Sequence, residues 1–238
     1  MIMWYSSQIN YAAPLIIIVK LLQYSDGAFL LNFTDNRYGA TAWKTNLIKY
    51  RLSRSFAANE TANIRTAINI FERNTCIRFE ERNRLNGDGI VFWRTHRELC
   101  RGTVGKQPFN NVYGYWRCWS KIGYILHEIM HNFGFRHEHQ RPDRDDYIKI
   151  HKHRVIDDHE KFFLRINDNS HDTYGTDYDP YSVMHYEPTL FVRADYNVTL
   201  EPVQSWIDAQ RIGQKEVLSD GDIAALNELF NCSSKTAP

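Results

Sequence analysis

One short run of residues constrains the fold of this chain more than any other. Residues 127–137 read His-Glu-Ile-Met-His-Asn-Phe-Gly-Phe-Arg-His. On an α-helix, residues four positions apart lie on one face, about 40° from each other. His127 and His131 can therefore reach the same metal ion, and Glu128 projects beside them. That is where a general base for a metal-bound water is needed.

The apolar residues around this run also indicate a helix. Those that fall within about 60° on a helical wheel, away from the histidines, are Ile122, Ile125, Leu126, Ile129 and Phe133. We therefore expect a helix over about residues 120–134 that buries one side and presents its histidines on the other. Gly134 can end this helix, because glycine adopts a left-handed φ without strain. The chain can then turn and bring His137 back as a third ligand.

Three histidine nitrogens with one open position are the ligand set of a catalytic zinc site, whereas structural zinc sites use four protein ligands. The alternative is a buried amphipathic helix with incidental histidines. Average composition makes these fixed residues in one window a chance event on the order of one in a million. The complete pattern, with its glycine and third histidine, is the metzincin form of the zinc peptidase motif.

Composition excludes other classes of protein. The net charge of the 238-residue chain is only +1, so it has no footprint for nucleic acid or an anionic membrane surface. Residues 11–19 are apolar, but Lys20 interrupts the run before it could span a membrane. We interpret residues 1–37 as a degraded signal and pro-segment, although no Lys or Arg precedes the apolar run. The alternative is an apolar strand packed on the domain.

The chain has four cysteines and no Cys-x-x-Cys pair, which indicates two disulfides formed in an oxidising compartment. Free buried thiols are the alternative, and the spacing leaves all three pairings open. Three glycosylation sequons are compatible with secretion of a glycoprotein; they begin at Asn32, Asn59 and Asn197.

Periodicity and turn residues predict the other elements. We expect strands at residues 43–52, 76–80, 90–93 and 111–116. We expect helices at about 60–74, with Asn59 as N-cap, around 157–164, and within 218–232, where Ser219 and Asp222 form a capping box. The charged run 141–147 is expected to be a solvated loop. The remaining histidines of residues 138–175 are expected to be surface or hydrogen-bonded residues: His139, His151, His153, His159 and His171.

From about Trp43 to Cys232 the sequence resembles the astacin family of metzincin endopeptidases. The zinc motif is followed by Glu138, as in that family, and then by Arg-Pro-Asp-Arg-Asp-Asp-Tyr at 141–147. Ser-Val-Met-His-Tyr at 182–186 matches the family's Met-turn. Thr-Cys-Ile-Arg-Phe and the segment ending at Cys232 also match.

The resemblance implies an α+β, two-lobed metzincin fold. The N-terminal lobe, about residues 38–134, would hold a mixed twisted sheet and two long helices, including the zinc helix. The C-terminal lobe, about 135–232, would be irregular and end in a final helix. Residues 233–238 would be a tail. The pairing implied is Cys76 with Cys232 and Cys100 with Cys118.

The resemblance also implies roles for site residues. One zinc ion would be bound by His127, His131 and His137. Tyr186 would be a further ligand in the resting enzyme and would then swing away to stabilise the tetrahedral intermediate. Glu128 would be the general base.

Two further residues take structural roles by the same resemblance. Met184 would pack beneath the histidines, and Glu138 would meet the mature amino terminus. In the pro-segment, Asp26 is a candidate zinc-blocking residue and Arg37 is a candidate activation site. The segment 106–117 is expected to form the edge strand that pairs with substrate.

The expected function is that of a secreted zinc endopeptidase, made as a zymogen, which acts on extended protein or peptide substrates. We expect a monomer with neither a nucleic-acid partner nor a membrane span. The alternatives are an inactive zinc-binding module, a different metzincin peptidase, and a latent form with residues 1–37 across the cleft. The sequence does not identify the physiological substrate.

Overall fold

The computed structural model describes residues 43–166 and 175–232. These residues all belong to one compact unit, Phe33–Pro238. The expectations for residues 1–37, for His171 and for the tail 233–238 lie outside the described residues. No helix in the two described ranges is long and apolar enough to cross a membrane.

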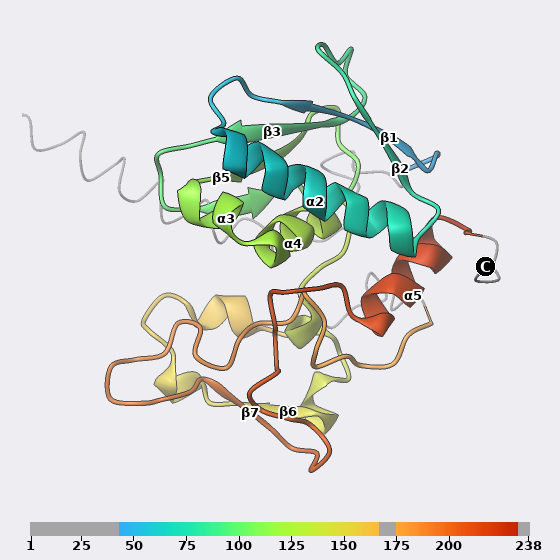
Figure 1. The fold of residues 1–238 in the computed structure, drawn as a ribbon. Coiled ribbons are helices and arrows are strands. Elements are labelled where there is room, and N and C mark those ends of the chain that lie inside the picture. Colours follow the sequence, from blue (N-terminus) through green and yellow to red (C-terminus); the bar gives the residue numbers. More distant parts are fainter. Residues whose placement is uncertain (1–42, 167–174, 233–238) are drawn as a thin grey trace, which may run out of the picture. The chain divides into compact units, whose positions relative to one another are not determined.

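A five-stranded mixed sheet forms the first half of this unit (Figure 1). Its strands are β1 (Leu47–Leu52), β2 (Arg78–Glu81), β3 (Ile90–Arg94), β4 (Cys100–Gly102) and β5 (Asn110–Gly114). The order across the sheet is β2-β1-β3-β5-β4. The first four strands in this order are parallel, and β4 pairs antiparallel with β5 at the edge.

The edge strand is not the one expected from the sequence. Segment 106–117 contributes β5, which lies inside the sheet between β3 and β4. The edge strand on that side of the sheet is β4, with β2 at the opposite edge, and the three residues of β4 are too few to show an alternating pattern. The expected strand at 111–116 is also too long, because residues from Trp116 onward form a short helix, α3 (Trp116–Ser120).

Three helices cover one face of the sheet: α2 (Ala58–Asn74), α3 and α4 (Ile122–Phe133) (Figure 1). The expected N-cap of α2, Asn59, is wrong. Ala57 is the N-cap, and its N–H donates to the Glu60 carboxylate at 2.9 Å, which satisfies the helix end from within its first turn. At α4, Gly134 has φ 106° and its N–H donates to the His131 carbonyl, so glycine ends the helix as expected.

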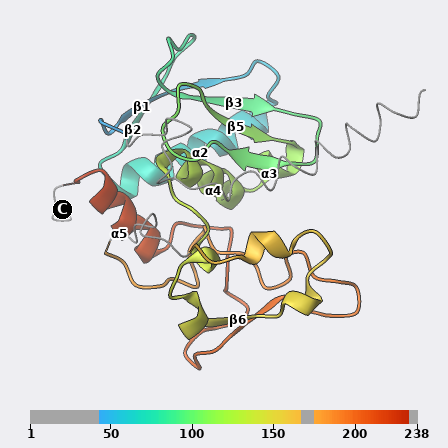
Figure 2. The ribbon, with the colours of Figure 1, turned by 180° about the vertical axis from the view of Figure 1, so that it is seen from behind.

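The second half of the unit is largely irregular. It contains one antiparallel pair, β6 (Ile148–Ile150) with β7 (Leu200–Pro202), and the final helix α5 (Asp220–Leu229) (Figures 1 and 2). The Ser219–Asp222 capping box forms as predicted. The helix expected around 157–164 is a shorter 3₁₀ turn, Glu160–Phe163.

The α+β fold with its two halves is reflected in two hydrophobic cores. The first lies between the sheet and its helices and includes Ile48, Phe71, Phe92, Trp119 and Leu126. The second lies in the irregular half and includes Ile148, Val155, Phe163, Tyr178 and Leu200. Met184 and Leu226, from the second half of the chain, join the first core. That contact places the Met184 turn directly beside α4.

The prediction that segment 141–147 is a solvated loop is wrong for its two arginines, which are both buried. Arg141 is only 3% exposed and Arg144 only 5%. Arg141 makes a two-pronged contact with Asp143, and its remaining donors reach the carbonyls of Thr176 and Asp177. Buried guanidinium groups are stable only when their donors are satisfied. The partners here are distant carbonyls, which a local charge pattern does not reveal.

Both expected disulfides form, so the free-thiol alternative is wrong. Cys76 is joined to Cys232, with their Cα atoms 5.4 Å apart. Cys100 is joined to Cys118, with Cα atoms 5.8 Å apart. The first bridge ties the residues after α5 to the start of β2, and the second ties edge strand β4 to α3.

Candidate metal centre

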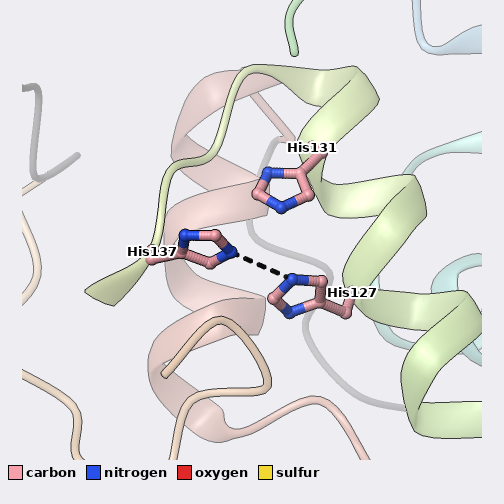
Figure 3. A group of neighbouring side chains, drawn as sticks. All are labelled: His127, His131 and His137. Carbon is pink, nitrogen blue, oxygen red and sulfur yellow. Dashed lines mark hydrogen bonds between the residues drawn. The ribbon is translucent and has the colours of Figure 1, made fainter. Parts of the chain in front are cut away.

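Three histidine rings converge at the end of α4 (Figure 3). His127 and His131 project from successive turns of the helix, and His137 returns after the Gly134 turn. One nitrogen from each ring lies within 4.8 Å of the others, and the Nε2 atoms of His127 and His137 are 3.2 Å apart. Nitrogens bound tetrahedrally to zinc at about 2.0–2.1 Å are about 3.3 Å apart. The spacing of this pair therefore fits a shared zinc ion.

Backbone carbonyls fix the orientation of two of these rings. His127 Nδ1 donates to the Val183 carbonyl and His131 Nδ1 to the Phe135 carbonyl, each at 2.8 Å. Because a carbonyl only accepts, Nδ1 carries the hydrogen in both rings and Nε2 keeps its lone pair. The two lone pairs face the ring of His137.

Burial also keeps the rings neutral. It lowers the pKa of His131 to about 4 and the pKa values of His127 and His137 well below their usual range, with further lowering from neighbouring histidines for the latter two. Neutral imidazole is the form that binds a metal ion. The donor set is therefore ready for zinc at neutral pH.

Glu128 follows the first of the three histidines, His127, on α4 and is itself buried, with 5% of its surface exposed. Burial raises the pKa of its carboxyl to about 8, although the N–H of Gly102 donates to the carboxylate and opposes the rise. Its Oε2 atom has no hydrogen-bond partner among the described residues. A buried carboxylate oxygen without a partner, one residue along the helix from a histidine of the cluster, fits a site that would bind a metal ion and its water.

Helix α4 is buried on nearly every side, which corrects the expected open face for its ligands. His127 and His131 are each only 8% exposed. The Met184 turn covers one histidine through Val183, and edge strand β4 lies against the other side of the helix.

Gly102 is a site residue that the sequence analysis missed. A Cβ atom at this position would lie 2.2 Å from the Glu128 carbonyl oxygen and 3.0 Å from the His131 Cβ. Gly105 follows and donates its N–H to the His131 carbonyl at 2.8 Å. Glycine therefore allows β4 to approach α4 at Glu128. A lone glycine in a short segment gives no sequence signal of this contact.

The Met184 turn passes beside the three histidines. Met184 is 2% exposed, and its carbonyl accepts the N–H of Glu138 at 3.1 Å. Two residues on, the Tyr186 ring lies 4.6 Å from the His137 ring. The role of metal ligand that the sequence suggested for Tyr186 stays a prediction.

Glu138 is buried next to the third histidine. Burial raises the pKa of its carboxyl to about 8, and the nearby Arg141 opposes that rise. Its Oε1 atom accepts the Asp179 N–H at 2.9 Å and lies 3.3 Å from Arg141. The expected contact with a mature amino terminus involves residues outside the described range. The other described histidines of this half, among them His139 and His153, stand outside the three-histidine group.

Fold, metal ligands and buried glutamate together define a zinc peptidase of the metzincin type. The family model of astacin, peptidase family M12A, matches residues 35–231. The chain belongs to this family, and the three-histidine cluster provides its zinc site.

Known relatives agree with this assignment. Zinc metalloproteinase nas-6 of Caenorhabditis elegans is 31% identical over 91% of this chain. Bone morphogenetic protein 1 of Xenopus laevis is 33% identical over 80% of it. The chain spans 61% of the length of nas-6 and 27% of the length of the Xenopus protein.

Solved structures share the fold. High choriolytic enzyme 1, a hatching enzyme zinc-protease from the medaka fish Oryzias latipes, matches with a TM-score of 0.72 and 27% identity, covering 85% of this chain and 99% of that one. Myroilysin matches with a TM-score of 0.57 over 81% of this chain and 97% of its own, at 15% identity, which shows the fold alone.

Proposed function

We propose that this chain is a secreted zinc-dependent endopeptidase that hydrolyses internal peptide bonds of proteins. The observation that carries the proposal is the cluster of three converging histidine nitrogens, together with the buried Glu128 that adjoins His127 on α4. The zinc metalloproteinase and hatching-enzyme names of its relatives support the same reaction. Zinc, when bound, lowers the pKa of a coordinated water and polarises the substrate carbonyl.

Glu128 takes the proton of the attacking water and passes it to the leaving amine. A base that works in both directions needs a pKa near the working pH. Burial raises the pKa of the Glu128 carboxyl, and a bound zinc ion would lower it again, so the two effects oppose each other at this group. The Gly102 N–H holds the carboxylate in place. Tyr186 donates to the developing oxyanion from beside His137; one such donor contributes about 3–4 kcal/mol.

The substrate pairs with β4 in an extended conformation. β4 is the edge of the five-stranded sheet, so one side of its backbone has no strand neighbour among the described residues. An edge strand is a template for a further strand. Because Gly102 of β4 also donates to Glu128, a peptide paired with this edge would run past the general base.

The wider organisation follows the same family pattern. Two disulfides support an oxidising, extracellular location. We assign residues 38–232 to one catalytic domain with lobes at about 38–134 and 135–232, preceded by a signal and pro-segment, and we expect it to act as a monomer. Glu138, buried against Asp179 and Arg141, would receive the mature amino terminus.

The test compares Glu128→Ala with the parent, after maturation, for casein cleavage and zinc content. We expect full zinc content and loss of cleavage, because Glu128 is not one of the three ligands. Glu160→Ala, at an exposed glutamate, is the control and should match the parent. Parental cleavage by Glu128→Ala would refute its role as base.

The metal ligands are tested separately. His137→Ala should lose zinc and cleavage together, while His153→Ala, at an exposed histidine outside the cluster, should keep both. A zinc-loaded parent that cleaves nothing in a broad peptide library would instead favour an inactive binding module.

A further inference from the structure

The Tyr186 ring is enclosed by aromatic rings from three other segments of the chain. His139 stacks on it face to face, with centroids 3.9 Å apart and planes 25° from parallel. Phe163 and Phe191 meet it edge-on, at 5.6 Å and 6.1 Å. On the metal side lies His137, at 4.6 Å. We call His139, Phe163 and Phe191 the tyrosine cage.

Two walls of the cage are held by one buried arginine. His139 and Phe163 are both fully buried, and Arg144 Nη1 donates to both of their backbone carbonyls. The His139 ring is fixed as well, because its Nε2 donates to the Phe162 carbonyl at 2.9 Å. These contacts fix the His139 ring, which stacks on Tyr186 and also lies 5.6 Å from the His137 ring.

The third wall has an unusual backbone. Phe191 has φ 56°, in the left-handed region that is costly for a residue with a side chain. Its carbonyl accepts the Ile156 N–H at 2.8 Å, and its ring stacks on Phe162 with centroids 5.5 Å apart. Glycine would adopt this conformation without strain. A bulky ring at such a position indicates a gain from the ring itself, and strained residues cluster at functional sites.

We propose that the tyrosine cage positions Tyr186 for catalysis, with His139 as the main positioning residue. The stacked face of His139 opposes tilting of the phenol ring, while the edges of Phe163 and Phe191 limit its sliding. The cage thereby sets the ring position from which Tyr186 approaches the metal and the oxyanion. This inference rests on the proposed role of Tyr186, and its test separates the two.

The test is a double-mutant cycle, which isolates the interaction between two residues. His139→Leu and Phe191→Gly are each made alone and combined with Tyr186→Phe. Alone, each should lower kcat about tenfold or more with little change in KM, because small misplacements of a reacting group are costly. Combined with Tyr186→Phe, neither should lower kcat further. Glycine adopts the left-handed φ of residue 191 without strain, so we expect Phe191→Gly to fold. If His139→Leu does not fold, the kcat of Phe191→Gly alone and with Tyr186→Phe tests the proposal.

The control is Tyr196→Leu. Tyr196 packs on His153 and Arg154, and its ring is not one of the three walls of the cage, so this variant should keep the parental kcat. A ring lost away from the cage is thus compared with a ring lost from it. An equal loss in Tyr196→Leu would overturn the proposal.

A second readout does not depend on activity. A phenolate bound to Cu²⁺ absorbs visible light, so the Cu²⁺-loaded parent should show a band that Tyr186→Phe abolishes. His139→Leu and Phe191→Gly should weaken or shift that band, and Tyr196→Leu should not. An unchanged band in both cage variants would overturn the proposal.

The two hypotheses fail differently. If Tyr186→Phe alone cleaves casein at the parental rate, the proposed role of Tyr186 is wrong. The cage then has no catalytic group to position. If Tyr186→Phe is impaired but the cage variants lower kcat equally in both backgrounds, Tyr186 keeps its role and the positioning inference is wrong.

Discussion

Replacing Gly102 by alanine tests how closely the edge strand must approach the zinc helix. The new Cβ would lie 2.2 Å from the Glu128 carbonyl oxygen and 3.0 Å from both the carbonyl carbon and the His131 Cβ. Non-bonded heavy atoms are comfortable at about 3.5 Å, so β4 must withdraw by about 1 Å. Both near residues lie within the regular hydrogen bonding of α4, so the strand is the part that moves.

The magnitude depends on that displacement. Overpacking at a buried contact destabilises by about 1–3 kcal/mol. Withdrawal also breaks the hydrogen bond from the Gly102 N–H to the Glu128 carboxylate. A misplacement of about 1 Å costs about 10²-fold in rate, so kcat/KM should fall about 100-fold. Zinc should stay bound, because Val183 and Phe135, which orient the two helix histidines, are not on β4.

The assay combines urea unfolding, zinc content and kcat/KM on a peptide substrate. Gly87→Ala is the control. Nothing lies within 4 Å of a Cβ there, but its φ of 90° imposes a backbone cost of about 1 kcal/mol. It should lose stability and keep its activity. Gly102→Ala with parental stability and parental kcat/KM would refute the close approach of β4.

Three further predictions concern stability. Replacing Cys76 and Cys232 by serine should lower the free energy of unfolding by about 5 kcal/mol, against about 3 for Cys100 and Cys118, because the sequence separations are 156 and 18; equal losses in urea titrations would contradict the loop-length argument. Asp222→Asn should cost about 2–3 kcal/mol, since its buried carboxylate accepts from the Ser182 hydroxyl and two backbone N–H groups; an unchanged thermal midpoint would count against it. Burial, and then Glu81, raises the pKa of Tyr50 from 10.0 to about 12. The unfolded chain therefore loses this proton first, stability falls between pH 10 and 12, and Tyr50→Phe should reduce that fall.

Features set by local spacing could be predicted from the sequence. His127 and His131 share a helix face because of the helical period, and Gly134 ends that helix because of its φ. The Ser219–Asp222 box needs only three residues of separation. The family resemblance supplied the disulfide pairing, which spacing left open.

Features set by contacts between distant segments could not be predicted from the sequence. The pair of Gly102 and Glu128 depends on how β4 meets α4, and the burial of Arg144 depends on carbonyls at His139 and Phe163. Helix α3 has five residues, fewer than two helical turns, so it shows no period. The cage around Tyr186 draws on three segments whose proximity no single stretch encodes.

The bridge between Cys76 and Cys232 also determines what a single proteolytic cut does to the molecule. A single cut anywhere between these residues leaves both fragments covalently joined. The polypeptide from β3 to α5, which carries the zinc ligands and Tyr186, lies entirely inside that loop. A nicked molecule would therefore keep its mass until the disulfide is reduced, and only reducing gel electrophoresis would reveal the damage.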